Sequence, residues 1–122
     1  MIILACGSRD WDNQEIVRAA LQELDESSVV VSGAARGADS IAADLAREMG
    51  LEVWEFAADW EAYGKRAGMM RNLQMLDQNP DQVWAFWDGQ SRGTAHTVRA
   101  ARKRGIQVRI WNFAGEEQTS LF

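Results

Sequence analysis

The chain contains little cysteine, histidine or proline. Its single cysteine, Cys6, excludes an intramolecular disulfide, and one cysteine with one histidine, His96, cannot supply the four ligands of a structural zinc site. We therefore expect no metal and no cofactor. One proline and ten glycines, without any biased tract, argue against a disordered or fibrous chain.

Long apolar segments are also missing. The apolar run at the start of the chain extends from Met1 to Cys6 and ends at Gly7, with no basic residues beside it. It is too short for the hydrophobic region of a signal peptide or for a membrane span. A length of 122 residues and a hydrophobic content of 47% suit one domain with its own core. We predict a soluble, cytoplasmic domain that does not associate with membranes.

Charge is unevenly spread along the chain. Residues 1–61 carry 13 acidic and 4 basic side chains, whereas residues 62–122 carry 5 acidic and 9 basic ones. The net charge of −5 argues against a protein that coats DNA in general, because such binding depends on many phosphate contacts. One local anion site remains compatible with this balance.

Short apolar runs alternate with segments of helical periodicity. The expected strands are Ile2–Cys6, Val29–Ser32, Glu52–Phe56, Val83–Trp87 and Gln107–Trp111, the expected helices are Asn13–Leu24, Ser40–Met49, Met69–Leu76 and Thr94–Lys103, and Ala57–Gly68 is expected to be a loop. Strands separated by helices predict a Rossmann-like α/β three-layer sandwich with a mainly parallel five-stranded sheet. The domain is expected to span residues 1–113, followed by a tail at 114–122.

The loops after the first four expected strands each contain glycine and at least one cation. These loops meet at one edge of a parallel sheet, where ligands bind. Glycine lets backbone amides approach an anion, and arginine grips phosphate with two parallel hydrogen bonds. Trp11, Trp60 and Tyr63 are suited to stacking on a base. We predict that a phosphorylated, base-bearing ligand contacts residues of these loops: Gly7, Ser8, Arg9, Gly33, Arg36, Gly37, Asp39, Trp60, Tyr63, Lys65, Arg71, Asn72, Gly93 and Thr94.

Each of these features also has a structural explanation. Glycines after strands are common turn residues, and Asp39 and Thr94 are suitable helix N-caps. Trp54, Trp84 and Trp111 lie on expected strands and are predicted to be core residues. The repetition across four loops on one edge favours the ligand site. No Gly-Lys-Ser/Thr P-loop is present, and no Gly-x-Gly-x-x-Gly follows the first strand, so a dinucleotide dehydrogenase is not supported.

Four segments carry a family resemblance: GSRDW at 7–11, GAARGAD at 33–39, ADWEAYGKRAGMMRNLQM at 58–75, and Gly93-Thr94. Together they resemble the YspA/YpsA-related branch of the SLOG superfamily, whose relatives include the Smf/DprA DNA-processing proteins and the Lonely Guy phosphoribohydrolases. The branch has many phage and bacterial members. The resemblance implies a Rossmann-like fold, a nucleotide or nucleotide-derived ligand, and a homodimer.

The Lonely Guy resemblance raises the question of catalysis. Arg71 lies at the position of that family's Met-x-x-Arg arginine, and Ser91 to Thr94 resemble its phosphate-binding turn. The place of the family's catalytic glutamate is occupied by Thr97, which cannot act as a carboxylate. Two hypotheses stay open. One is a sensor or sequestering module. The other is a nucleoside 5′-monophosphate phosphoribohydrolase, for which the catalytic candidates are Arg71, Asp59, Glu61 and Asp88.

The last five residues are outside this pattern. Gln118, Leu121 and Phe122 resemble the peptide with which many proteins dock on the bacterial sliding clamp, the leucine and phenylalanine filling an apolar pocket. A third hypothesis is therefore an adaptor or inhibitor at the clamp. The alternative is that these apolar residues fold back onto the domain.

Overall fold

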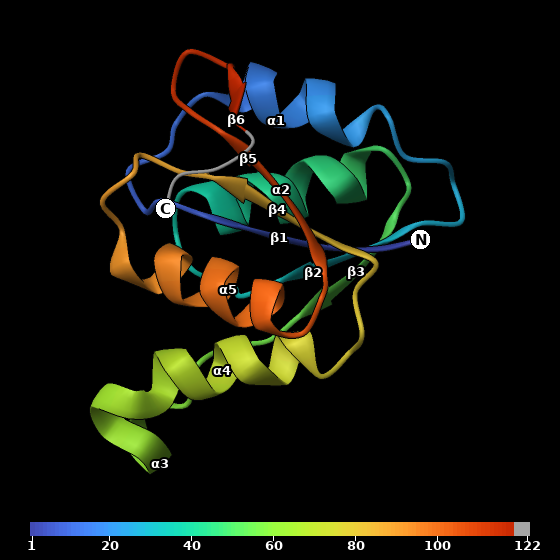
Figure 1. Ribbon diagram of the computed structural model, residues 1–122. Helices are drawn as coiled ribbons and strands as arrows, with labels where there is room; N and C mark the ends of the chain where they lie inside the picture. Colours follow the sequence, from blue (N-terminus) through green and yellow to red (C-terminus); the bar gives the residue numbers. More distant parts are fainter. Residues whose placement is uncertain (119–122) are drawn as a thin grey trace.

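A computed structural model describes residues 1–118 of the chain. Its centre is one sheet with the strand order β3-β2-β1-β4-β5-β6 (Figure 1). The strands are β1 (Ile2–Gly7), β2 (Val29–Ser32), β3 (Glu52–Glu55), β4 (Gln82–Phe86), β5 (Gln107–Trp111) and β6 (Glu117–Gln118). The first five pair in parallel, and β6 pairs antiparallel with β5 at the edge. The predicted Rossmann-like α/β fold is confirmed.

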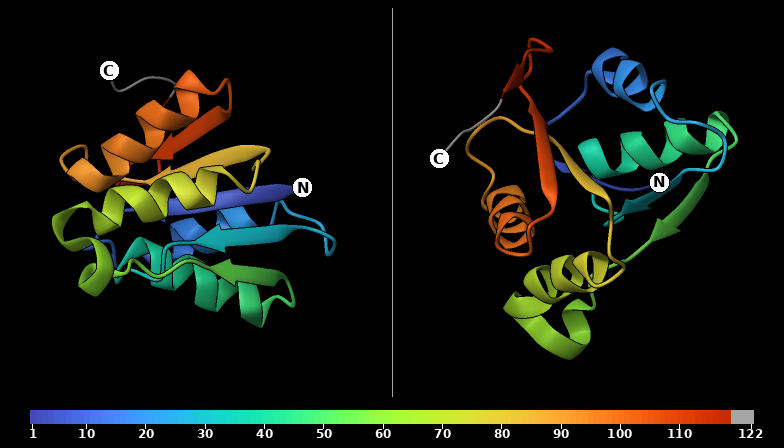
Figure 2. Two further views of the ribbon diagram at one scale, coloured as in Figure 1. Left: turned by 90° about the horizontal axis from the view of Figure 1, so that it is seen from below. Right: turned by 45° about the vertical axis from the view of Figure 1, so that its right-hand side comes forward.

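Helices cover both faces of this sheet. The helices are α1 (Gln14–Leu21), α2 (Ala38–Glu48), α3 (Trp60–Tyr63), α4 (Ala67–Leu76) and α5 (Arg92–Lys103), with a short 3-10 helix at Gly64–Arg66. The pair α1 and α2 packs on one face, and the pair α4 and α5 packs on the other (Figures 1 and 2). The result is the three-layer sandwich that the alternation of strands and helices predicts.

The central strands are buried because they carry apolar side chains on both faces. On β1, Ile3 and Ala5 belong to the core under α1 and α2, whereas Leu4 and Cys6 belong to the core under α4 and α5. This is the pattern expected of a parallel strand covered on both sides. The free thiol of Cys6 is buried, as its place in an apolar strand predicts.

Most tryptophans are core residues. Trp84 and Trp111 are buried as predicted, and Arg109 lies over both rings while pairing with Glu23. The interpretation of Trp11 as a residue that stacks on a base is wrong. Its side chain is 2% exposed and packs against Phe86 and Phe113, with ring centroids 5.8 and 4.9 Å apart, so no ligand reaches it.

Two segments differ from the sequence prediction. The expected loop 57–68 contains α3, the 3-10 helix and the start of α4. Asp59 accepts a hydrogen bond from the amide of Ala62 and so caps α3, while Gly64, at φ +56°, ends it. The expected tail 114–122 contributes β6, a sixth strand held by the ion pair of Arg109 with Glu117 (2.7 Å).

The topology places the site. After β1 the chain crosses to β2 on one side, whereas β4 lies on the other side of β1. The loops that leave the carboxyl ends of β1 and β4 therefore diverge, and they leave a crevice at this switch point. The loop after β2 and the N-terminal parts of α4 and α5 complete the same edge (Figure 2).

Candidate functional site

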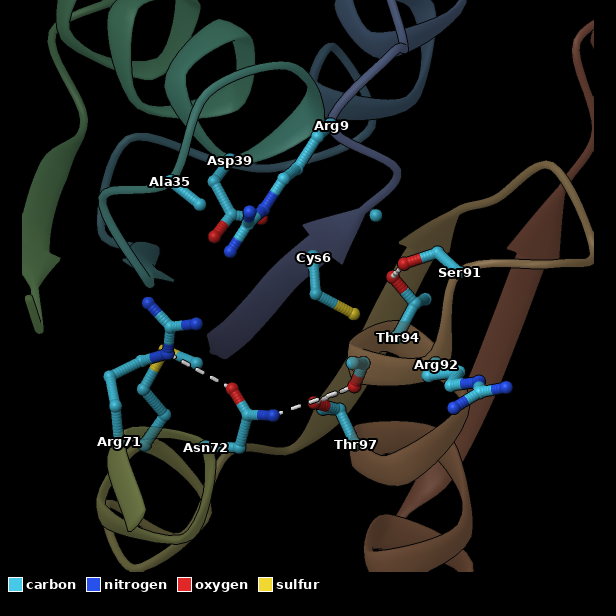
Figure 3. Close-up of a pocket in the computed structure, with 13 residues that line it drawn as sticks. Cys6, Arg9, Ala35, Asp39, Arg71, Asn72, Ser91, Arg92, Thr94 and Thr97 are labelled. Atoms are coloured by element: carbon cyan, nitrogen blue, oxygen red, sulfur yellow. Dashed lines mark hydrogen bonds between the residues drawn. The ribbon is translucent and has the colours of Figure 1, made fainter. Parts of the chain in front are cut away.

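A cavity of about 270 Å³ opens at the carboxyl ends of β1 and β4. Its walls come from four separate segments of the chain: Cys6, Gly7, Arg9, Ala35, Asp39, Arg71, Asn72, Met75, Ser91, Arg92, Gly93, Thr94 and Thr97. Figure 3 shows the side chains of Arg9, Asp39 and Arg71 pointing toward one another, while Arg92 points away from them. We call this space the phosphate cavity, because Arg9 and Arg71 line it and guanidinium groups suit phosphate.

Ser8 holds two of the contributing loops together. Its amide donates to the carbonyl of Phe86 at 2.9 Å, and its hydroxyl accepts from the amide of Asp88 at the same distance. The side chain is 1% exposed and lies outside the walls of the cavity. Ser8 therefore positions the loop after β1 against the loop after β4.

Gly37 brings the loop after β2 against the same segment. It has φ +77°, and a Cβ at this position would lie 2.4 Å from the carbonyl oxygen of Ser8. Both the left-handed backbone and the close approach require glycine. The next amide, that of Ala38, donates to Ser8 at 3.1 Å. Gly37 is thus a packing residue of the site, outside the cavity wall.

Arg71 enters the crevice from α4. One of its terminal nitrogens donates to the carbonyl of Gly33, and its Nε donates to Oδ1 of Asn72 at 3.0 Å. The pKa of Arg71 is lowered from its usual value by burial, and the nearby positive charge of Arg9 lowers it further, against the attraction of Asp39. Two guanidinium groups are therefore held close enough to repel, and an anion between them would relieve this repulsion.

Asp39 is the acid in this cluster. Burial raises the pKa of its carboxyl to about 6, although the charge of Arg71 and hydrogen bonds from the amides of Ala35 and Gly33 act in the opposite direction. It lies in the first turn of α2, whose N-cap is Gly37, so the expectation that Asp39 is the N-cap is wrong. Its carboxyl faces the arginines (Figure 3).

The raised pKa of Asp39 makes stability depend on pH. The folded state binds the proton of the Asp39 carboxyl more tightly than the unfolded state does, so protonation of Asp39 stabilises the fold. This contribution is fully present below the pKa of the unfolded state, near 3.8, and is lost as the pH rises through the folded-state pKa of about 6. Relative to Asp39→Asn, we expect wild-type stability to fall by about 2 to 3 kcal/mol between about pH 4 and pH 7. Urea unfolding of both proteins across this range measures it, and a pH-independent difference would contradict the burial of this carboxyl.

The N-terminus of α5 forms the opposite wall. Its N-cap residue, Ser91, makes no capping hydrogen bond with its side chain; its hydroxyl lies 3.3 Å from that of Thr94. Behind the helix start, the carbonyl of Gly93 accepts hydrogen bonds from Asn72 (3.4 Å) and Thr97 (3.2 Å). The first amides of α5 and the positive end of its dipole therefore border the cavity without a side-chain acceptor from Ser91.

A second cavity, of about 410 Å³, adjoins the first. Its walls are Arg9, Gly33, Ala34, Ala35, Arg36, Ala57, Ala58, Trp60 and Arg71. Arg9, Ala35 and Arg71 line both cavities, which places the two spaces side by side. The indole of Trp60 is 52% exposed at this place. We call this space the arginine cavity.

The structure brings most of the predicted ligand residues to these two walls, and it places others elsewhere. Tyr63 and Lys65 lie outside both walls, as do Ser8 and Gly37. Sequence reasoning did not include Cys6, Ala35 and Met75, which line the phosphate cavity. A cysteine and a methionine in apolar patterns carry no signal for a ligand, because the same patterns build a core.

Two of the three carboxylates proposed as catalytic candidates, Asp59 and Asp88, accept hydrogen bonds from backbone amides. Asp59 caps α3 and lines neither cavity, and Glu61 is exposed on that helix. Asp88 accepts hydrogen bonds from the amides of Gln90 (2.8 Å) and Ser91 (2.9 Å). Burial would raise the pKa of Asp88, but these backbone hydrogen bonds outweigh it and lower the pKa. Asp39 is the carboxylate that lines the phosphate cavity.

Three further observations concern metals, membranes and the tail. Residues 1–118 contain no group of three or more histidine, cysteine or acidic side chains able to hold a metal ion. No helix in this part of the chain is both long and apolar enough to cross a membrane. Of the predicted clamp-binding residues, Gln118 lies in β6, whereas Leu121 and Phe122 fall outside the described residues.

The fold is similar to that of a DNA-processing protein. The X-ray structure of DNA processing protein A (DprA) from Streptococcus pneumoniae matches with a TM-score of 0.74 at 18% sequence identity. The match covers 89% of this chain and 49% of that chain, so the chain spans about half the length of the DprA chain. At this identity the likeness shows the fold alone.

Sequence comparisons give the family. The Gene 61 protein of Mycobacterium phage D29 is 44% identical over 115 residues, which cover 87% of this chain and 92% of the phage protein. The model of the "YspA, cpYpsA-related SLOG family" matches residues 1–63, the half that carries Gly7 to Arg9 and Gly33 to Asp39. The chain belongs to the YspA/cpYpsA-related SLOG family.

Proposed function

We propose that this protein binds a nucleotide or nucleotide-derived phosphorylated ligand in the crevice, as a sensor or sequestering module. The family generally binds nucleotide-derived ligands. The observation that carries the proposal is the meeting of Arg71, Arg9 and the α5 N-terminus in one cavity. In this arrangement a phosphate group lies against the first amides of α5, with the guanidinium of Arg71 on its other side.

The glycine at position 93 supports this placement of the phosphate. Gly93 lies in the first turn of α5, and a Cβ built on it would have nothing within 4 Å. Alanine at a helical position is more stable than glycine by up to about 1 kcal/mol. Glycine here leaves open the space beside the helix amides, where a phosphate oxygen would approach.

Binding accounts for the site better than hydrolysis does. The hydroxyl of Thr97, at the place of the glutamate of the Lonely Guy enzymes, is buried and donates to the carbonyl of Gly93. Asp59 and Asp88 hold backbone amides elsewhere. The carboxyl of Asp39 is held between two arginines, which favours a role in balancing their charge.

The variant Gly93→Ala tests the proposal, because its effects on stability and on affinity are opposite. We expect it to raise stability by up to about 1 kcal/mol. It should weaken nucleoside 5′-monophosphate binding roughly ten- to a hundredfold, as expected for the loss of one or two charge-assisted hydrogen bonds. Thermal unfolding with and without a panel of nucleoside 5′-monophosphates, followed by calorimetric titration, measures both quantities.

The matched control is Gly68→Ala in α4. A Cβ there would meet the ring of Trp60 at 3.5 Å, an ordinary contact, and Gly68 lines neither cavity. Both variants are also titrated with inorganic phosphate, a probe that does not extend to Trp60. Gly68→Ala should gain similar stability and keep its affinity for this probe, whereas Gly93→Ala should lose affinity for it. Equal ligand affinity in Gly93→Ala and in the unsubstituted protein would contradict the placement of the phosphate at the α5 N-terminus.

A further inference from the structure

The arginine cavity has a strongly one-sided charge. Three guanidinium groups line it, those of Arg9, Arg36 and Arg71, and no aspartate or glutamate of residues 1–118 is part of its wall. The remaining wall consists of glycine and alanine with one indole, and the carboxyl of Asp39, which interacts with Arg71 and Arg9, lines the phosphate cavity instead. A cavity of this kind attracts negative charge.

Several surface arginines outside the two cavities are paired with carboxylates, although Arg66 is in no such ion pair within the described part of the chain. Arg18, Arg47, Arg104 and Arg109 each lie within 4 Å of a carboxylate oxygen. Within residues 1–118, no carboxylate oxygen lies at that distance from Arg9, Arg36 or Arg71. Three arginines that meet at one cavity without such a partner are suited to an anion from outside the chain.

One phosphate bound in the phosphate cavity does not occupy all the hydrogen-bond donors of these three arginines. Arg71 already donates hydrogen bonds from its Nε to Asn72 and from one terminal nitrogen to the carbonyl of Gly33. Its remaining donors are sufficient for the phosphate at α5. Arg36 lines the arginine cavity and not the phosphate cavity. A phosphate at the α5 N-terminus therefore does not neutralise the charge of Arg36.

We propose that the arginine cavity binds a second anionic group of the same ligand, and that the ligand class is a nucleotide with two phosphate groups at separate positions. This inference rests on the proposed function. The second phosphate lies between Arg9 and Arg36, and the base stacks on the exposed face of Trp60. The two cavities share Arg9, Ala35 and Arg71 but are otherwise lined by different residues, so we place the two phosphates at separate positions of the ligand, and the 5′-diphosphates test the alternative of adjacent phosphates.

Calorimetric titration with three sets of probes tests this. The probes are the 5′-monophosphates, the 5′-diphosphates and the 3′,5′-bisphosphates of adenosine, guanosine, cytidine and uridine. For the preferred base we expect the 3′,5′-bisphosphate to bind at least about tenfold more tightly than the other two, which corresponds to one added charge-assisted contact. Arg36→Ala should remove most of this advantage. Arg66→Ala makes the same charge change outside both cavities and should retain it.

The outcomes separate this inference from the proposed function. Monophosphates that bind as tightly as the bisphosphates would overturn the second anion site and leave the phosphate site standing. The same conclusion follows if the advantage survives Arg36→Ala or is matched by the 5′-diphosphates. A protein that binds none of the twelve probes would overturn both proposals.

Discussion

Replacing Arg71 with alanine is expected to weaken nucleoside 5′-monophosphate binding roughly 100-fold, about 3 kcal/mol, the range for loss of a charge-assisted contact to phosphate. The side chain lines both cavities, and its hydrogen bonds to Gly33 and Asn72 fix the direction in which its guanidinium points. The substitution removes an attraction for the ligand. It also removes Arg71 as one of the two cations, with Arg9, that lower the pKa of the Asp39 carboxyl.

Two variants make this result specific. Arg71→Lys keeps the charge but loses the planar fork that reaches Gly33, Asn72 and a phosphate together, so we expect it to restore only a small part of the affinity. Arg104→Ala removes one positive charge at a surface ion pair with Asp77, outside both walls, and should bind as the unsubstituted protein does. Calorimetry on the three variants decides the matter. Equal losses in Arg71→Ala and Arg104→Ala would mean that net charge, not this site, governs binding.

The sheet was predictable because its signal is local and repeated. A run such as Val29–Ser32 is short, apolar on both faces and ended by glycine, and these properties suit a parallel strand buried under helices. The loops that follow such strands share one edge for topological reasons, so Arg9 and Gly93 were expected to meet although 84 positions separate them. They line one cavity.

Short elements and side-chain directions were not predictable in this way. The helix α3 has four residues, too few for a 3.6-residue period to show, and β6 has two. The division of the crevice depends on Arg71 reaching across to Gly33, 38 positions away, which is a matter of rotamer and packing. Trp11 shows the same limit, because an indole suits stacking on a base and packing in a core equally well. Its contacts with Phe86 and Phe113 decide that it is a core residue.

Replacing Gly7 with alanine is expected to destabilise the protein by at least about 3 kcal/mol and to lower its melting temperature by roughly 10 °C or more. Gly7 ends β1, and a Cβ there would lie 2.1 Å from the carbonyl oxygen of Phe86 and 2.6 Å from the Cβ of Ala38. Neither neighbour can turn aside, because one is backbone of β4 and the other begins α2. The same carbonyl of Phe86 accepts the amide of Ser8, so separating the strands also breaks a contact that holds the site's loops.

A second glycine separates crowding from the general effect of adding a methyl group. Gly50 has φ +79°, and a Cβ there would have nothing within 4 Å, so Gly50→Ala carries backbone strain without a clash and should cost about 1 kcal/mol. Thermal and urea unfolding of the two variants give the comparison. A melting temperature for Gly7→Ala within about 3 °C of the unsubstituted protein would contradict the close packing of β1 against β4 and α2. The floor of the phosphate cavity, formed by Cys6 and Gly7, depends on that packing.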